Sequence, residues 1–152
     1  MVTNTTGLNG SLWHNAPDHT PNDSNGYCLL FDASSAPGIF YSRLFENLCH
    51  NTNYTFSCFV ANIVRPFACS GSSIEPNLKF SIFGPPTMTE LGSTSTGDIA
   101  TTEDMTWSQY SISFTTGQSQ EEILIEITNN ASGGCGNDLA IDGVFFGLCG
   151  QA

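Results

Sequence analysis

The strongest constraint on the fold of this chain is a period of two. Apolar and polar residues alternate through several short runs, and no stretch keeps the longer period of a helix. The runs cover residues 27–32, 39–45, 54–63, 78–83, 109–115, 122–129 and 139–148, with clusters of Gly, Pro, Asn and Ser between them. Two shorter strands are expected at 12–13 and 90–94. Since each alternating strand buries one face, we predict an all-β domain.

Eight or nine antiparallel strands with long connections fit a two-sheet β-sandwich of the jelly-roll type. The 152 residues are enough for one domain with a core, and 39% hydrophobic residues argue against disorder. We therefore expect a single sandwich over residues 11–152, preceded by an N-terminal extension over 1–10. The long loops 64–76 and 97–106 are expected to shape a binding face.

The charge balance excludes several classes of partner. Three Lys and Arg face 14 Asp and Glu, for a formal charge of -11, so nucleic-acid backbones and anionic membrane surfaces are not expected partners. No apolar run approaches the roughly 20 residues of a membrane span, so membrane insertion is not expected either. The first residues show no signal peptide and resemble the start of an excised domain. Cations and neutral ligands remain compatible with this composition.

Six cysteines, with no pair at zinc-binding spacing, predict disulfides and an oxidising compartment, secreted or at the cell surface. Fifteen pairings are open to six cysteines, and the sequence alone does not choose among them. We favour Cys49–Cys149 and Cys69–Cys135, which would tie loop ends to the chain terminus. Cys28–Cys58 would then join two strands.

Several motifs resemble known extracellular modules. Trp13, Asp-His-Thr at 18–20 and Gly-Tyr at 26–27 are similar to the opening of MAM-type domains, and Leu-Ala-Ile-Asp at 139–142 is similar to their closing strand. The stretches 38–41, 53–56 and 106–110 resemble secreted carbohydrate-binding modules of the galactose-binding-like jelly-roll superfamily, above all a module repeated in bacterial adhesins and surface-attached glycan-degrading proteins. The resemblance covers roughly residues 11–150. Gly143 departs from it, since the family usually has a second Asp there.

The resemblance implies a structural calcium between an early loop and the last strand. Asp142 lies in an otherwise apolar run, where an ionised carboxylate needs a partner or a metal. The loop over 18–26 is rich in the oxygen ligands that Ca²⁺ takes. We predict Asp18, Asp23 and Asp142 as ligands, with loop carbonyls near Asn25. The alternative is that Asp18 serves a turn and that Asp142 accepts hydrogen bonds from His19 or loop amides.

The resemblance also implies glycan binding, in which sugar rings stack on exposed aromatic side chains and polar groups bind their hydroxyls. The candidate ligand-binding residues are Trp13, Tyr41, Arg65 and Trp107, of which Tyr41 and Arg65 are preferred. Both tryptophans are also good core residues. Tyr41 and Phe40 are adjacent in a strand, so one of them should face outward.

Catalysis is not expected, because neither a nucleophile elbow nor histidines at metal-ligand spacing occur, and the adjacent Glu121 and Glu122 at a strand start are expected to be solvated. The predicted function is that of a non-catalytic carbohydrate-binding module, with a glycan as its partner. The alternative is an adhesion or assembly module that contacts other proteins or copies of itself, as MAM-type domains do. A glycan binder should expose aromatics in one groove, whereas an assembly module should expose an apolar patch or an open edge strand.

Overall fold

The computed structural model describes residues 1–23, 25–33 and 36–148. Its strands are β1 (Val2–Thr3), β2 (Cys28–Phe31), β3 (Gly38–Phe45), β4 (Asn53–Asn62), β5 (Asn77–Gly84), β6 (Thr89–Asp98), β7 (Ser108–Thr115), β8 (Ile123–Asn129) and β9 (Leu139–Leu148), and a short 3-10 helix, η1, covers Ala68–Gly71. No helix in this part of the chain is long and apolar enough to cross a membrane.

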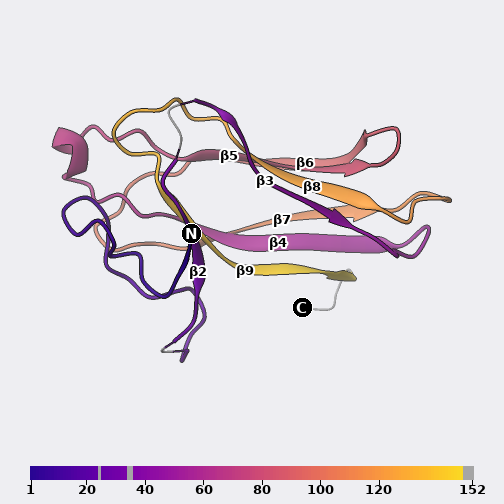
Figure 1. Ribbon diagram of the computed structural model, residues 1–152, viewed down its shortest axis with the longest axis horizontal. Coiled ribbons are helices and arrows are strands. Elements are labelled where there is room, and N and C mark those ends of the chain that lie inside the picture. The colour runs from indigo at the N-terminus through magenta and orange to yellow at the C-terminus, as the bar shows by residue number, and fades with distance from the viewer. Residues whose placement is uncertain (24, 34–35, 149–152) are drawn as a thin grey trace.

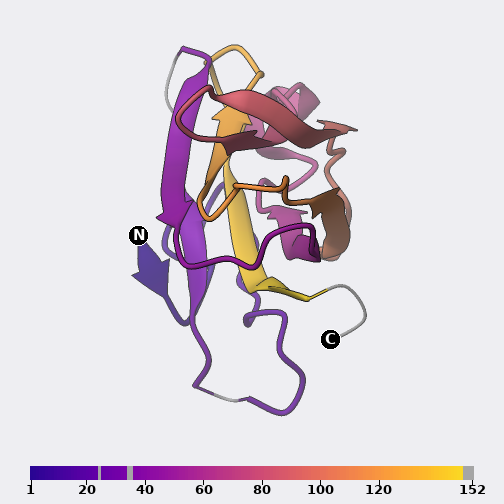
Figure 2. The same cartoon turned by 90° about the vertical axis from the view of Figure 1, so that its right-hand side faces the viewer.

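The strands form two sheets, in the orders β1-β2-β9-β4-β7 and β3-β8-β5-β6, and every pairing between described strands is antiparallel. They run along the long axis of the molecule, with η1 and several long loops at one end (Figure 1). Figure 2 views the same sandwich along that axis. The predicted two-sheet β-sandwich is confirmed, and each of the seven long predicted strands is present.

The main core lies between the sheets, where alternation puts the apolar residues of each strand. On β4 and β8 this core takes every second residue, including Phe56, Val60, Ile125 and Ile127. Burying a side chain of this size stabilises the fold by about 1.5–3 kcal/mol. Tyr110 packs against this core, as its alternation predicted.

A second core covers the outer face of the five-stranded sheet. It contains Trp13, Cys28, Leu30, Ile63, Val64, Ala68 and Ala140. Leu29 and Ile141 contact the main core, so their strand neighbours Leu30 and Ala140 face the other side. The N-terminal segment supplies Trp13 to this second core. A segment between strands thus covers a sheet face that would otherwise be exposed.

Residues 1–10, predicted as an extension, are tied to the sandwich. Val2 and Thr3 form β1 and pair with β2. Thr6 is fully buried, and its hydroxyl contacts the carbonyl of His14. Two residues of strand are too short for alternation to reveal, which explains why the sequence pattern gave no sign of β1.

Candidate functional site

The two tryptophans predicted to bind sugar, Trp13 and Trp107, both pack against the second core. Trp13 is 6% exposed, and its indole Nε1 donates to Oδ2 of Asp138 at 2.9 Å. Trp107 is half-buried against the second core, 6.0 Å from the His19 ring in an edge-on arrangement. Trp13 therefore ties the N-terminal segment to β9 and has no free face for a sugar ring to stack on.

Tyr41 lies on the edge strand β3, where a register shift between Ile39 and Tyr41 interrupts the alternation. Phe40 and Tyr41 are both half-buried and both pack against the main core. The expectation that one of them faces outward is therefore wrong, because the bulge removes the strict period of two. Tyr41 and Arg43 line a cavity of about 240 Å³ between the sheet edges, called the edge cavity below.

Arg65 lies in a different place, at the end of the sandwich where the long loops gather. An open hollow of about 580 Å³, called the loop-end hollow below, is lined there by His14, Asn15, Arg65, Pro66, Phe67 and Glu103. Phe67 is 67% exposed, and the Arg65 guanidinium lies 5.8 Å from the centre of its ring. An exposed aromatic ring beside donors and acceptors is the chemistry expected of a sugar site.

The chain after β4 places these groups by a series of hydrogen bonds. Oδ1 of Asn62 accepts the amide of Val64, and Nδ2 of Asn62 donates to the carbonyl of Ile99. The amide of Arg65 donates to the carbonyl of Leu12 at 2.8 Å. The turn that carries Arg65 and Phe67 is thereby joined to the N-terminal segment and to the β6–β7 connection.

Beyond Phe67 the backbone turns sharply through η1. Cys69, Ser70 and Gly71 have positive φ values of 54°, 58° and 76°. Cys69 forms a disulfide with Cys135, which confirms the pairing predicted for these two cysteines. The disulfide fastens the turn to the connection between β8 and β9, and so holds the Phe67 side of the hollow.

His14 is the unusual group of the loop-end hollow. It is 8% exposed, and its Nε2 has no hydrogen-bond partner. Burial is the main cause that lowers its pKa from the ordinary value, and Arg65 lowers it further; the Thr102 carbonyl and Asp104 act in the opposite direction. The imidazole is therefore neutral near pH 7. A buried acceptor without a donor costs free energy, which a ligand hydroxyl could recover.

Asp138 is a second buried carboxylate that the sequence pattern did not single out. It accepts hydrogen bonds from the Trp13 indole and, at 3.1 Å, from the amide of Ala33. Its pKa is raised, mainly by burial and in part by the neighbouring Asp32 carboxylate. Asp138 thus joins the N-terminal segment, next to His14, to the end of β2 and the start of β9.

The predicted calcium ligands do not form a group of three. Among the described residues, no cluster of three or more His, Cys, Asp or Glu is arranged to hold a metal. Oδ2 of Asp142 accepts the amide of His19 at 2.8 Å, which is the hydrogen-bonded alternative left open above. Asp23 is exposed, and its Oδ1 accepts the amide of Asn25. Asp18 is 8% exposed, and its side chain lines an open surface hollow with His19 and Asp23.

Asp18 and Asp142 nevertheless both lie close enough to Cys28 to affect its thiol. Both raise the pKa of the buried Cys28 thiol, after the larger effect of burial itself. A Cβ on Gly26 would lie 2.1 Å from Oδ2 of Asp18, so only glycine leaves room for this carboxylate. Two such carboxylates fit a cation, whereas Asp23 does not belong to the pair. The calcium prediction is untested and narrows to Asp18 and Asp142.

Gly143 has a structural reason to replace the second Asp of the resembling family. Its φ is 56°, and it lies where the pairing of β4 and β9 shifts register between Ser57 and Phe59. A Cβ there would approach the Phe59 ring to 3.0 Å. A bulged position with positive φ favours glycine over an acidic side chain.

The predicted Cys28–Cys58 disulfide is wrong, since both cysteines are buried free thiols. β9 lies between β2 and β4, so the two backbones are about 9.5 Å apart, beyond the reach of a disulfide. Cys28 also faces the second core while Cys58 faces the main core. The alternation of each strand did not show which strand would come between them.

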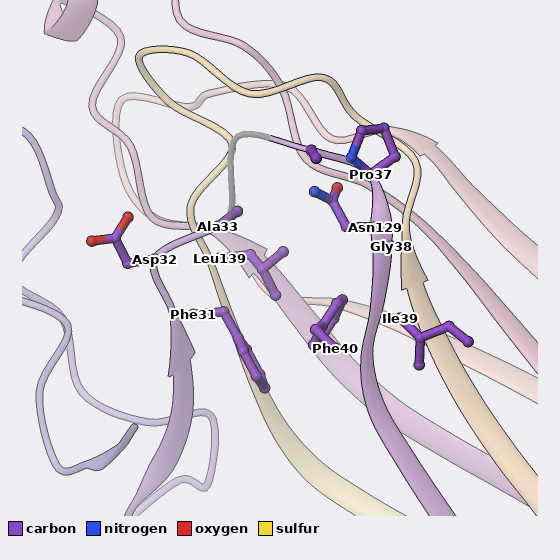
Figure 3. A pocket seen from close by; sticks show the side chains of 10 residues that line it. Phe31, Asp32, Ala33, Pro37, Gly38, Ile39, Phe40, Asn129 and Leu139 are labelled. Carbon is purple, nitrogen blue, oxygen red and sulfur yellow. The ribbon is translucent and has the colours of Figure 1, made fainter.

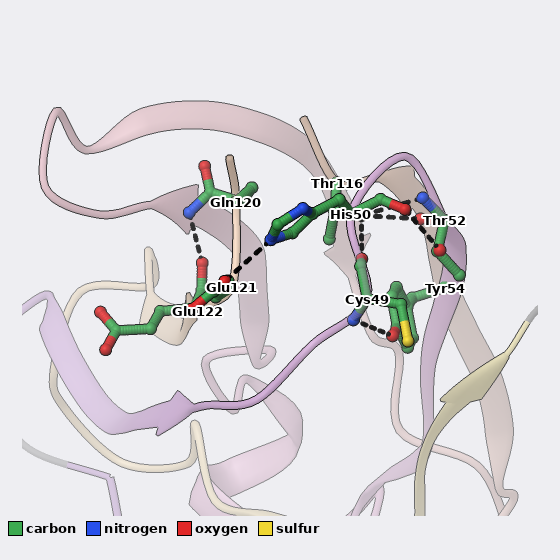
Figure 4. A network of polar contacts seen from close by, with 8 residues as sticks. All are labelled: Cys49, His50, Thr52, Tyr54, Thr116, Gln120, Glu121 and Glu122. Atoms are coloured by element: carbon green, nitrogen blue, oxygen red, sulfur yellow. Dashed lines mark hydrogen bonds and ion pairs between the residues drawn. The ribbon is translucent and has the colours of Figure 1, made fainter. Parts of the chain in front are cut away.

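At the opposite end of the sandwich, polar contacts join the loop after β3 to β4 and to the connection between β7 and β8 (Figure 4). Nε2 of His50 lies 2.9 Å from the Glu121 carboxylate, and the amide of Cys49 donates to the Tyr54 hydroxyl. Cys49 is exposed and has no disulfide partner among the described residues. Its predicted partner Cys149 lies outside the described residues, so the Cys49–Cys149 pairing stays a prediction.

Sequence reasoning found Arg65 but missed Phe67 and His14. Phe67 lies in the long loop that was expected to shape a binding face, yet composition does not show which side chains of a loop are exposed. His14 follows directly after Trp13, which is the only signal that it is buried.

Comparison with known proteins gives the fold and little more. No protein-family model matches the chain, and no curated protein matches its sequence. Among similar solved structures, the Stig cyclase Fisc from Fischerella sp. TAU is 15% identical over 95% of this chain and 72% of that chain, with a TM-score of 0.57. This likeness concerns the fold alone.

Two weaker likenesses have lower TM-scores. The EclA C-terminal domain, a sugar-binding protein, is 15% identical over 84% of this chain and 87% of that chain, with a TM-score of 0.48. A structure titled "CBM4 structure and function" is 17% identical over 70% of this chain, with a TM-score of 0.45, and the match spans 59% of its length. The chain thus has a jelly-roll β-sandwich fold.

Proposed function

We propose that this domain is a non-catalytic carbohydrate-binding module of a secreted or cell-surface protein and that it binds sugar in the loop-end hollow. The observation that carries this proposal is that one hollow is lined both by the exposed ring of Phe67 and by His14, whose buried Nε2 has no hydrogen-bond partner. The ring is an apolar platform for the C–H face of a sugar, and Nε2 accepts one of its hydroxyls. Arg65 supplies donors, and Glu103 and Asn15 supply further polar contacts.

The single exposed aromatic ring in the hollow favours binding of the end of a glycan over binding along the interior of a polysaccharide. Phe67 is the one strongly exposed aromatic that lines it, and Tyr27, the other strongly exposed aromatic among the described residues, does not line it. One platform holds one ring, whereas binding along a chain would need two or three in a row. Glu103 and the formal charge of -11 favour neutral sugars over uronic acids.

The test is a binding screen with neutral methyl glycosides and matched polysaccharides, followed by variants. We expect Phe67→Ala and His14→Gln each to weaken binding about tenfold, because stacking and a buried hydrogen bond each contribute about 1–1.5 kcal/mol. Tyr27→Ala is the matched control and should leave affinity unchanged. Absence of binding to the whole panel, or equal affinity for Phe67→Ala and wild type, would contradict the proposal.

A structural calcium at Asp18 and Asp142 is a second part of this proposal. The ion would neutralise both carboxylates and fasten the loop over 18–26 to β9. Saturating Ca²⁺ at about 100 times its Kd would stabilise the fold by about 2.7 kcal/mol. We expect a chelator to lower the melting temperature of wild type but not that of Asp18→Asn. An unchanged melting temperature after chelation would show that no ion is bound.

The assembly alternative rests on the edge strand β3, which exposes Ile39 (57%) and Leu44 (46%). Self-association through this strand would appear in a sizing experiment as a dimer that Leu44→Lys returns to a monomer. A monomer at high concentration would leave the glycan function as the better supported one.

A further inference from the structure

The edge cavity has the features of a second binding site, separate from the loop-end hollow. Six apolar side chains from four strands line it: Leu29, Phe31, Phe56, Ile127, Ile141 and Val144. It lies where β2 and β3, strands of different sheets, leave the sandwich open at one side. None of the residues that line it is acidic, in a chain with 14 Asp and Glu.

Two hydrogen-bond donors, the Tyr41 hydroxyl and the Arg43 guanidinium, belong to residues that line this apolar cavity. Tyr41 and Arg43 are two apart on β3, so their side chains leave the strand on the same face. Neither the Tyr41 hydroxyl nor the Arg43 guanidinium forms a hydrogen bond or ion pair with any described residue. Lys79, by contrast, pairs with Glu90 at 3.5 Å. The guanidinium lies 5.0 Å from the centre of the Phe45 ring, which orients it without using its donors.

The chemistry of the two parts defines the ligand. A guanidinium and a phenol hydroxyl together match the two oxygens of a carboxylate, since Arg binds carboxylates in a bidentate manner. The apolar lining matches a hydrocarbon chain and offers no partner for sugar hydroxyls. The volume of about 240 Å³ suits a small ligand.

Phe31 also lines a neighbouring hollow of about 270 Å³, in which Phe31, Phe40 and Leu139 lie together (Figure 3). The rings of Phe31 and Phe40 are 4.5 Å apart, centre to centre. Phe31 thus lines both of these neighbouring apolar spaces.

We propose that the edge cavity binds the carboxylate of a small amphiphilic acid, with Arg43 and Tyr41 holding the carboxylate and the apolar side chains holding the tail. This proposal does not depend on the glycan site. The competing explanation is that Arg43 is an inward-pointing charge that prevents β3 from pairing with another sheet edge. In that case Arg43 needs no ligand, and its removal promotes association.

The test is calorimetric titration of the whole domain with octanoate at physiological salt. We expect octanoate to bind, 1-octanol to bind about tenfold more weakly or worse, and acetate not to bind, because both the charge and the tail are needed. Arg43→Gln should weaken octanoate binding about tenfold to a hundredfold, and Arg43→Lys should recover part of it. Tyr41→Phe should weaken it about threefold to tenfold.

Arg65→Gln is the control in the other site and should leave octanoate binding unchanged while it weakens sugar binding. Two results would overturn the proposal: no heat of binding with octanoate, or the same affinity in Arg43→Gln as in wild type. Concentration-dependent association of Arg43→Gln with no change in octanoate binding would establish the competing explanation.

Discussion

The loop-end hollow and the edge cavity are built by different means. The hollow lies on loops, and explicit ties hold it: the Cys69–Cys135 disulfide, the Asp138 hydrogen bonds and the side chain of Asn62. The edge cavity lies on strands, and the register of β3 against β8 places Tyr41 and Arg43 without a cross-link. Loops need such ties because they lack the repeated hydrogen bonds of a sheet. Changes to the ties should therefore affect the hollow and spare the cavity.

The largest effect is expected from removing the disulfide. Cys69→Ala combined with Cys135→Ala opens a loop with a sequence separation of 66 and should cost about 4 kcal/mol of unfolding free energy. Sugar binding should weaken further than stability alone explains, because Phe67 lies two residues from Cys69. Urea unfolding and octanoate titration of the same variant provide the comparison. Equal losses in both sites would mean that the ties do not distinguish them.

Asp138→Ala should cost about 3 kcal/mol, since it leaves the Trp13 indole and the Ala33 amide without an acceptor. Asp32→Ala is the matched control. Asp32 is exposed and raises the pKa of Asp138, so its removal should change stability by less than about 0.5 kcal/mol. Chemical denaturation measures both. Equal costs for the two variants would contradict the role assigned to Asp138.

Acid should weaken sugar binding in the hollow. The pKa of His14 is lowered from its ordinary value of 6.5, so the folded state resists the proton that the unfolded chain accepts. Stability is therefore full above pH 6.5 and declines as the pH falls below it. Protonation of Nε2 also removes the acceptor for the ligand. We expect sugar affinity to fall about tenfold as the pH drops through the lowered pKa of His14, and His14→Gln to show no such step.

No histidine lines the edge cavity, so an anion that stays ionised at pH 5 should bind there without this step. If ligand affinity fell with pH in the same way at both sites, the cause would be a change in the whole fold and not the titration of His14.

The smallest expected effect is a difference in the number of free thiols, which can be counted without changing the fold. Cys28 and Cys58 are buried, and burial raises the pKa of Cys58 to about 12, so neither should react in the native protein. We expect no reactive thiol in the native state and two after unfolding without reductant, if Cys49 and Cys149 are paired. Four thiols after unfolding would disprove the Cys49–Cys149 pairing. A count of zero thiols would show that Cys28 and Cys58 form a disulfide after all. Intact-mass labelling distinguishes these outcomes.

Alternation predicted the strands because a period of two follows from the backbone geometry of any strand. It located β9 with Ile141 inward and Asp142 on the other face, and it located Ile112 and Phe114 in the core. It failed for Phe40 and Tyr41, because a bulge inserts a residue that only the pairing with β8 reveals. It could not place β9 between Cys28 and Cys58, since strand order is not written in the local pattern.

The sequence by itself determined the class of the molecule: an all-β sandwich with a strongly acidic composition and enough cysteines for disulfides, with binding as the expected role. Local periodicity and composition carry that information. The tertiary structure decided which side chains share a site. Arg65 meets His14 and Phe67, whereas Tyr41 meets Arg43 over an apolar cavity. These groupings depend on strand order, bulges and loop ties, and all of these arise from contacts between residues far apart in the chain.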